Sequence, residues 1–436
     1  MIPLRKRLAF VIRGGRIIDP ANHVDRTADL FVQRGKIAGI GTAPEDFSAD
    51  AEIDARGRIV CPGLVELSAR LREPGLEHKA TIESETRAAA AGGITTLCCP
   101  PDTDPVIDTP AVVELIRQRA DQAGLSRVVT LGALTQGLGG ERLSEAAALQ
   151  QAGCCGLSNA LRPMANSQVQ RRAFEYAASF GATVFVHAED HWLANGGCAH
   201  EGAIATRMGL PAIPAAAETA AVARDLALVE QTGVRTHFCR LSTARAVQMV
   251  ARAQYDGLPV SADVAIPYLF LTDMDIVGFN AQCHVRPPLR TAYDRDALRA
   301  GLARGTLNAI CADHQPHEAD AKLAPFPSTA PGISGLDTLL SLALRLIDEN
   351  LLTLSDVIER LTVGPARILG LESQGVGSLS VGKRADIAVI DLERPWRVAP
   401  ETLHSAGRNT PFLGWELKGQ VTHTFVGGKL VFQRDD

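Results

Sequence analysis

The chain has 436 residues, enough for a large domain and an accessory one, and its 46% hydrophobic content is typical of a globular protein. A formal net charge of −5 provides no basic surplus for a nucleic-acid backbone, and no apolar run could span a bilayer. The apolar stretch after the basic residues 1–7 stops at Arg13, too short for the core of a signal peptide. We therefore expect a cytoplasmic protein that binds neither nucleic acid nor membrane, with nine buried cysteine thiols rather than disulfides.

Short strands separated by glycine turns are predicted at both ends of the chain. The N-terminal candidates are residues 8–12, 16–18, 30–32 and 37–41, with a turn at Gly14-Gly15. The C-terminal candidates are residues 385–391, 421–426 and 429–432. Neither end has enough strands to bury both faces of a sheet. We therefore predict that residues 1–61 and 373–436 form one composite β-sandwich.

Between these ends, predicted strands alternate with predicted helices, the pattern of a parallel sheet. The strands are residues 64–67, 95–98, 128–131, 155–157, 183–187, 236–241, 260–265 and 307–312. The helices are residues 82–91, 111–123, 144–151, 168–179, 217–231 and 244–255. Residues 62–372 are thus predicted to form an α/β fold, a (β/α)₈ TIM barrel, with its chemistry at the C-terminal strand ends. Polar residues that fall at those ends are Ser68, Ser158, His187, Arg240 and Asp313.

Residues 61–75 read Cys-Pro-Gly-Leu-Val-Glu-Leu-Ser-Ala-Arg-Leu-Arg-Glu-Pro-Gly. This stretch resembles the first-strand signature of the amidohydrolase superfamily, and most closely that of dihydroorotases, Pro-Gly-x-x-Asp-x-His-x-His-x-Arg-x-Pro-Gly. Further stretches typical of dihydroorotases follow in order at residues 92–96, 108–110, 187–190, 241–243, 287–290, 313–317, 331–336 and 409–415. The resemblance covers essentially the whole chain. It implies a barrel of the amidohydrolase type.

In active members of this family, one or two zinc ions at the strand ends activate a hydroxide that attacks a cyclic amide. The two histidines of the signature alternate along one strand, so both reach the same metal. This chain has Ser68 and Arg70 in their places. A serine is a poor zinc ligand, and a guanidinium offers no lone pair. The sequence pattern of the signature is therefore retained, but its two metal-binding histidines are lost.

The remaining metal positions are also depleted. The bridging carboxylate of the family falls in a stretch that contains Asn159 and Ala160, where no carboxylate remains. A later histidine has become Arg240, while His187 and the catalytic aspartate, Asp313, are retained. A catalytic zinc site needs about three protein ligands, one more than this pair supplies. We therefore expect that zinc binding is lost and that no cofactor is present.

The positions that meet the substrate in the family are altered as well. Arg72, expected to meet a substrate carboxylate, is retained. Asp102 and Arg286 replace two asparagines, so a side-chain amide is lost at each position. These residues are interpreted as a vestigial substrate site.

A lone buried carboxylate at Asp313 would be costly without a metal. We hypothesise that Arg70, Arg240 or both pair with Asp313 and fill the former metal site. The alternative is that these are two unrelated surface arginines. A thiol site around Cys239 and Cys311 is conceivable, but their spacing does not require one.

The sequence therefore predicts a catalytically inactive dihydroorotase-like protein, a pseudoenzyme. The pattern of lost ligands resembles that of non-catalytic dihydroorotase-like subunits of bacterial aspartate transcarbamoylase. That resemblance implies a structural role in pyrimidine biosynthesis, in a hetero-oligomer with the transcarbamoylase catalytic subunit, and is compatible with a homodimer. Two alternatives stay open. One is a remodelled hydrolase of another cyclic amide, like a hydantoinase, and the other is a regulatory anion site formed by Arg70, Arg72, Arg240 and Arg286.

Overall fold

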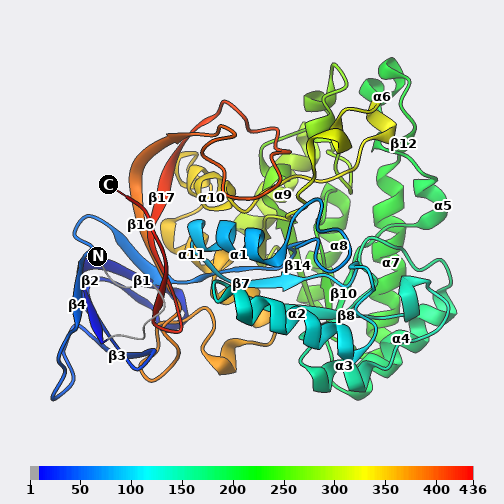
Figure 1. The fold of residues 1–436 in the computed structure, drawn as a ribbon. Helices are drawn as coiled ribbons and strands as arrows, with labels where there is room; N and C mark the ends of the chain where they lie inside the picture. Colours follow the sequence, from blue (N-terminus) through cyan, green and yellow to red (C-terminus); the bar gives the residue numbers. More distant parts are fainter. Residues whose placement is uncertain (1–8, 436) are drawn as a thin grey trace.

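The computed structural model describes residues 9–435, and a barrel of eight parallel strands forms its larger part (Figure 1). The strands follow one another around the barrel in chain order. They are β6 (Leu64–Glu66), β7 (Ile94–Cys99), β8 (Arg127–Ala133), β9 (Gly156–Ser158), β10 (Val184–Val186), β13 (Thr236–Phe238), β14 (Val260–Ala265) and β15 (Ala309–Cys311). All eight strands predicted from the sequence are confirmed.

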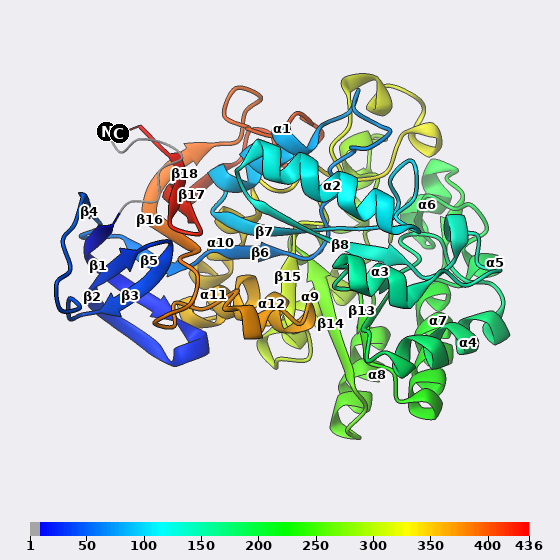
Figure 2. The ribbon, with the colours of Figure 1, turned by 60° about the horizontal axis from the view of Figure 1, so that its bottom comes forward.

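Helices follow the strands and cover the outside of the barrel (Figures 1 and 2). The long ones are α1 (Ile82–Ala91), α2 (Pro110–Ala123), α3 (Ala146–Ala152), α4 (Ser167–Ser179), α7 (Ala215–Thr232), α8 (Ala244–Tyr255), α9 (Ala292–Ala303), α10 (Leu339–Asp348), α11 (Leu354–Leu361) and α12 (Val363–Ile368). An excursion after β10 contains α5 (His191–Ala194), β11 (Ala199–His200), α6 (Ala203–Met208) and β12 (Ala212–Ile213). The six predicted helices are confirmed, and α9 to α12 were not predicted.

The barrel closes just beyond the ends of its first and last strands. Ala69 and His314 form a parallel bridge there. The backbone N–H of Arg70 donates to the carbonyl of His314 at 2.9 Å, and the N–H of His314 donates to the carbonyl of Ser68 at 2.8 Å. The ring is thus joined through the residues that were predicted to form the site.

Strands from both ends of the described chain build a second, eight-stranded sheet (Figure 2). Its order is β18-β17-β16-β5-β1-β2-β3, with β4 also paired to β1. The strands are β1 (Phe10–Asp19), β2 (Val24–Gln33), β3 (Lys36–Ile40), β4 (Ala51–Asp54), β5 (Ile59–Pro62), β16 (Ile387–Arg397), β17 (Glu416–Val426) and β18 (Lys429–Gln433). The predicted joining of the two ends is therefore confirmed, while the exact domain limits stay a prediction.

This sheet curls over its own core. Phe10 of β1 stacks on Phe425 of β17 with ring centroids 4.6 Å apart, although two strands separate β1 from β17 in the sheet. In a flat sheet, three strand spacings of about 4.8 Å would keep them far apart. The composite domain is thus a sandwich-like fold of one continuous sheet.

One predicted turn is wrong. The chain does not turn at Gly14-Gly15 but continues through it within β1, with a register shift between Ile12 and Gly15. A Cβ built on Gly15 would lie 2.5 Å from Cγ2 of Val60 on β5, so the glycine permits the close approach of the neighbouring strand. A bulge and a turn both require glycine, which explains the misreading. The predicted strand at residues 8–12 begins outside the described residues.

All nine cysteines are free thiols, and eight of them are buried, as the sequence predicted; Cys155 is half-buried. No helix among residues 9–435 has the length and hydropathy needed to cross a membrane.

We expect Phe425→Ala to lower the free energy of unfolding by about 3–5 kcal/mol, because it removes a fully buried ring from the composite core. Urea denaturation measures this change. Val381→Ala, at an exposed position, serves as control and should change stability by less than about 0.5 kcal/mol. A loss for Phe425→Ala no larger than the control would contradict the curled sheet.

Candidate functional site

The candidate site lies at the C-terminal ends of the barrel strands. Ser68 and Arg70 follow β6, Arg240 follows β13, and Asp313 follows β15. Arg240 and Asp313 have left-handed backbones, with φ of 53° and 44°. Such conformations are unfavourable for residues with a Cβ and need support from the surrounding structure. Two residues at the barrel mouth are therefore held in strained backbone conformations.

Asp313 is the centre of a buried polar cluster. Its Oδ1 accepts hydrogen bonds from Ser68 Oγ at 3.0 Å and from Arg70 Nη1 at 3.3 Å, and it lies 3.5 Å from Arg240 Nε. Its Oδ2 accepts a hydrogen bond from Gln315 Nε2 at 2.9 Å. The hypothesis that at least one arginine pairs with Asp313 is confirmed for both. The alternative of two surface arginines is wrong, because both guanidinium groups are buried.

Charges balance within this cluster. Arg70 Nε also donates to Asp102 Oδ2 at 2.8 Å, so one guanidinium bridges two carboxylates. Burial alone would raise the pKa of Asp102, but the charge and hydrogen bond of Arg70 outweigh it and lower that pKa. Burial disfavours the charged form of Arg240, yet the attraction of Asp313 raises its pKa. Two cations and two anions therefore lie together at the mouth of the barrel.

Glu66 holds the backbone next to this cluster, and it was not predicted from the sequence. It is fully buried at the end of β6, and its two carboxylate oxygens accept the backbone N–H of Ser68 at 2.8 Å and of Ala312 at 2.7 Å. Burial raises its pKa to about 8. Glu66 thus ties β6 to β15 beside Asp313. Its place in the first-strand signature, where the family has aspartate, was the signal that could have identified it.

His187 stands apart from Asp313. Its Nε2 lies 3.5 Å from Glu189 Oε2, and neither ring nitrogen has a hydrogen-bond partner among the described residues. Glu189 is held by Arg286, which donates from Nε to Oε2 at 3.1 Å and from Nη2 to Oε1. Burial opposes the charged form of Glu189, but contacts with His187 and Arg286 lower its pKa to about 2. Glu189 was also missed, although the stretch 187–190 contains it.

The bridging-carboxylate position has become part of a loop. Asn159 Oδ1 accepts a hydrogen bond from Thr135 at 2.7 Å, and its Nδ2 donates to the carbonyl of Arg162 at 3.0 Å. Ala160 is buried and brings no polar group. Both residues therefore shape the loop after β9, and neither contacts Asp313.

The former substrate positions are engaged by the protein itself. Arg72 Nε donates to the carbonyl of Pro316 at 3.0 Å, and Arg72 Nη2 lies 3.1 Å from His317 Nε2. Asp102 is bonded to Arg70, and Arg286 to Glu189. Each of the four arginines proposed for an anion site at the mouth therefore already has a protein partner.

One group of side chains has distances suited to a metal. Ligand atoms of His237, Cys239 and Asp263 lie within 4.8 Å of one another, and all three residues are buried. Two of these side chains already form hydrogen bonds within the protein. His237 Nε2 lies 2.9 Å from Asp263 Oδ2, and His237 Nδ1 lies 2.8 Å from Ser261 Oγ. The other oxygen of Asp263 accepts the backbone N–H of Arg240. Burial raises the pKa of the Cys239 thiol, which favours the neutral form over the metal-binding thiolate.

The donors at the family's metal positions do not fit a zinc ion. Ser68 donates its hydroxyl to Asp313, and two guanidinium groups lie where lone pairs would be needed. A cation placed against Asp313 would meet two positive charges in a buried setting. His187 and Asp313 are the only unchanged ligands.

Comparisons with known proteins agree with this architecture. A family described as dihydro-orotase-like matches residues 57–246, and one described as an amidohydrolase family matches residues 315–432. The chain is 51% identical to a dihydroorotase-like protein of Pseudomonas aeruginosa, over 98% of this chain and 100% of that protein. It is 47% identical to a dihydroorotase of Anaeromyxobacter dehalogenans, over 97% and 98%. The structure of an L-hydantoinase from Arthrobacter aurescens superposes with a TM-score of 0.88 at 25% identity, covering 98% of this chain and 97% of the other.

We expect Asp313→Asn to lower the free energy of unfolding by about 3 kcal/mol or more, because Arg70 and Arg240 would remain buried without their shared counter-charge. Urea denaturation at neutral pH measures the loss. Glu401→Gln, at an exposed position, is the matched control for removing a negative charge. Equal stability of the two variants would show that the pairing contributes nothing.

Proposed function

The chain belongs to the dihydroorotase-like family of amidohydrolases, and we propose that it is a non-catalytic member, a pseudoenzyme that works without zinc. One observation carries this proposal: Arg70 and Arg240 both contact Asp313, the position of the catalytic aspartate in the family. A general base must present a free lone pair to its substrate. Both oxygens of Asp313 are already occupied by protein donors.

The proposed role is structural. We propose that the protein assembles with the aspartate transcarbamoylase catalytic subunit in pyrimidine biosynthesis, as the pattern of lost ligands implies. Two relatives at 51% identity are named dihydroorotase-like proteins, whereas six relatives at 42–47% identity are named dihydroorotases. The names of the more similar pair support placing this chain apart from the enzymes.

Exposed apolar side chains supply a surface for such a partner. They lie on segments that follow β10, β14 and β15, so they share the end of the barrel that carries the arginine cluster. Trp192 is 75% exposed, Phe279 53% and Leu323 77%. Exposed apolar side chains at this end of the barrel would favour contact with another protein if they form one continuous patch.

A remodelled cyclic-amide hydrolase is the second candidate. The group His237, Cys239 and Asp263 favours it, because these side chains could hold one metal ion if their hydrogen bonds were exchanged. The likeness in fold to an L-hydantoinase is compatible with either candidate.

Turnover assays separate the two candidates. Protein equilibrated with zinc should hydrolyse dihydroorotate and hydantoin no faster than a blank without protein, because two guanidinium groups occupy the place beside Asp313 where a metal ion would be needed. The variants His187→Ala and Cys239→Ala identify any activity that belongs to this chain. Saturable turnover in the unchanged protein that either variant abolishes would establish a remodelled hydrolase.

Association is tested by size-exclusion chromatography with light scattering, on a mixture with the transcarbamoylase catalytic subunit of the same cell. A complex heavier than either component is expected. The double variant Phe279→Asp/Leu323→Asp should weaken it, because charge would replace exposed apolar contact. Tyr255→Asp, 83% exposed at the opposite end of the barrel, is the matched control. Separate elution of the two unchanged proteins at micromolar concentration would refute the assembly role.

A further inference from the structure

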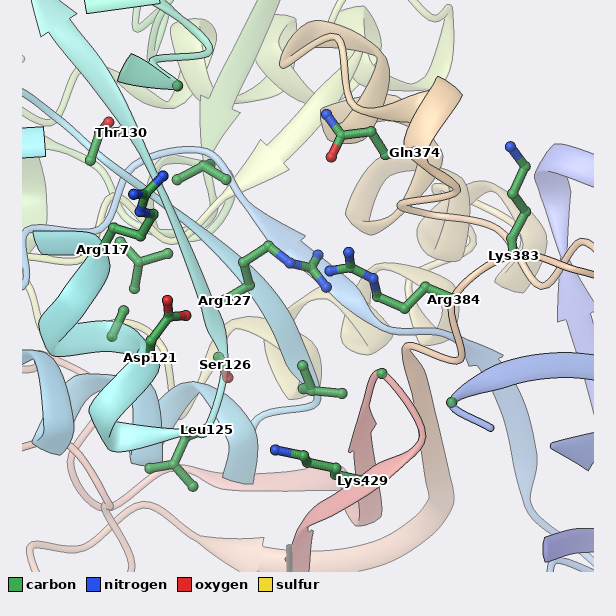
Figure 3. A pocket seen from close by; sticks show the side chains of 18 of the residues that line it. Arg117, Asp121, Leu125, Ser126, Arg127, Thr130, Gln374, Lys383, Arg384 and Lys429 are labelled. Atoms are coloured by element: carbon green, nitrogen blue, oxygen red, sulfur yellow. The ribbon is translucent and has the colours of Figure 1, made fainter. Parts of the chain in front are cut away.

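A cavity of about 820 Å³ lies between the barrel and the composite sheet (Figure 3). Its barrel wall comes from one face of α2, from the loop that follows it and from the first residues of β8. These are N-terminal strand ends, whereas the Asp313 cluster lies at the C-terminal ends. The cavity is therefore separate from the site described above.

The charged side chains of this cavity are almost all positive. Seven basic residues line it against one carboxylate, Asp121, in a chain whose formal net charge is −5. The basic residues are Arg34, Lys36, Arg117, Arg127, Lys383, Arg384 and Lys429. Like charges gathered in a hollow repel one another and create a strongly positive local potential.

Protein carboxylates neutralise only part of this charge. Arg127 pairs with Asp386 at 3.0 Å, and Arg117 pairs with Glu114. Lys383 donates to the carbonyl of Ser373 at 3.0 Å, which satisfies its hydrogen bond but leaves its charge unbalanced. Arg34, Lys36 and Lys429 form no ion pair with any residue in the range 9–435.

Backbone hydrogen bonds hold the cationic wall in place. Ile37 N donates to the carbonyl of Lys383 at 2.9 Å, which fixes the β2–β3 turn against residues 382–384. The β17–β18 turn packs on the same wall, because a Cβ built on Gly428 would lie 2.6 Å from the Cα of Gly35. Three chain segments that are distant in sequence thus present their cations from one rigid platform. Such preorganisation lowers the cost of binding an anion.

Part of the opposite wall is apolar, and Arg117, Asp121 and Arg127 lie beside that apolar part. Val113, Leu125 and Val129 belong to the barrel side of the cavity. Figure 3 shows Leu125 and Asp121 on the α2 side, Lys429 on the side of the composite sheet, and Arg127 directed toward Arg384. The cavity has a volume typical of small-molecule sites.

We propose that this cavity binds a small organic polyphosphate, with its phosphates against the cations of the composite sheet and its organic part against Val113 and Leu125. Phosphate oxygens form charge-assisted hydrogen bonds with guanidinium and ammonium groups. Several phosphates can balance Arg34, Lys36, Lys383 and Lys429 together. A ligand there would join the barrel to the composite sheet and stabilise the folded chain.

Isothermal titration with sodium tripolyphosphate and with ATP tests the proposal. Both should bind saturably, and ATP at least as tightly, because its organic part adds contact with the apolar wall. The double variant Lys36→Ala/Lys429→Ala should weaken both affinities about tenfold or more, because two charge-assisted contacts are lost. Lys418→Ala, an exposed lysine of β17 outside the cavity, should bind as the unchanged protein does.

The proposal is overturned if tripolyphosphate does not bind saturably or if the double variant binds it with unchanged affinity. It is also overturned if sodium sulfate weakens ATP binding as much as tripolyphosphate does, in a competition titration at matched ionic strength. ATP binding about tenfold weaker than tripolyphosphate would refute the placement of the organic part. A thermal-unfolding curve of each variant without ligand checks that it folds. If the double variant does not fold, a folded Lys383→Ala variant takes its place in the titrations.

Discussion

The contact of Asp313 with Arg70 and Arg240 is the interaction on which the barrel mouth depends. An isolated carboxylate buried at this depth would be strongly disfavoured, and so would either buried guanidinium. Each charge is therefore tolerated because the others are present. Asp102 completes the balance through Arg70. In the enzymes of this family metal ions supply that positive charge, whereas in this chain side chains do.

The same region also closes the barrel through hydrogen bonds between protein groups. Glu66 accepts two backbone N–H groups across the seam between β6 and β15. His314, in the bridge with Ala69, is buried with its Nε2 2.7 Å from Glu85 Oε2. Glu66 and the bridge at His314 therefore hold the backbone on both sides of Asp313, whose φ is 44°.

Sequence patterns predicted the strands of the barrel because each one is a short apolar segment bounded by turn residues. They also predicted the pairing of Asp313 with arginine, since a buried charge requires a partner. They did not separate a bulge from a turn at Gly15, because glycine serves both. Glu66 and Glu189 were missed because their partners are backbone groups and distant side chains. The basic cavity was missed for a similar reason: its cations come from separate segments that meet only in the folded chain.

The most direct test of the account is the zinc content per chain. Elemental analysis is done on protein purified without chelator, equilibrated with zinc and then freed of unbound metal. The account predicts near-zero zinc, because two guanidinium groups already satisfy Asp313. One or more equivalents of zinc, lost in His187→Ala, would contradict it and show that the metal site has been rebuilt.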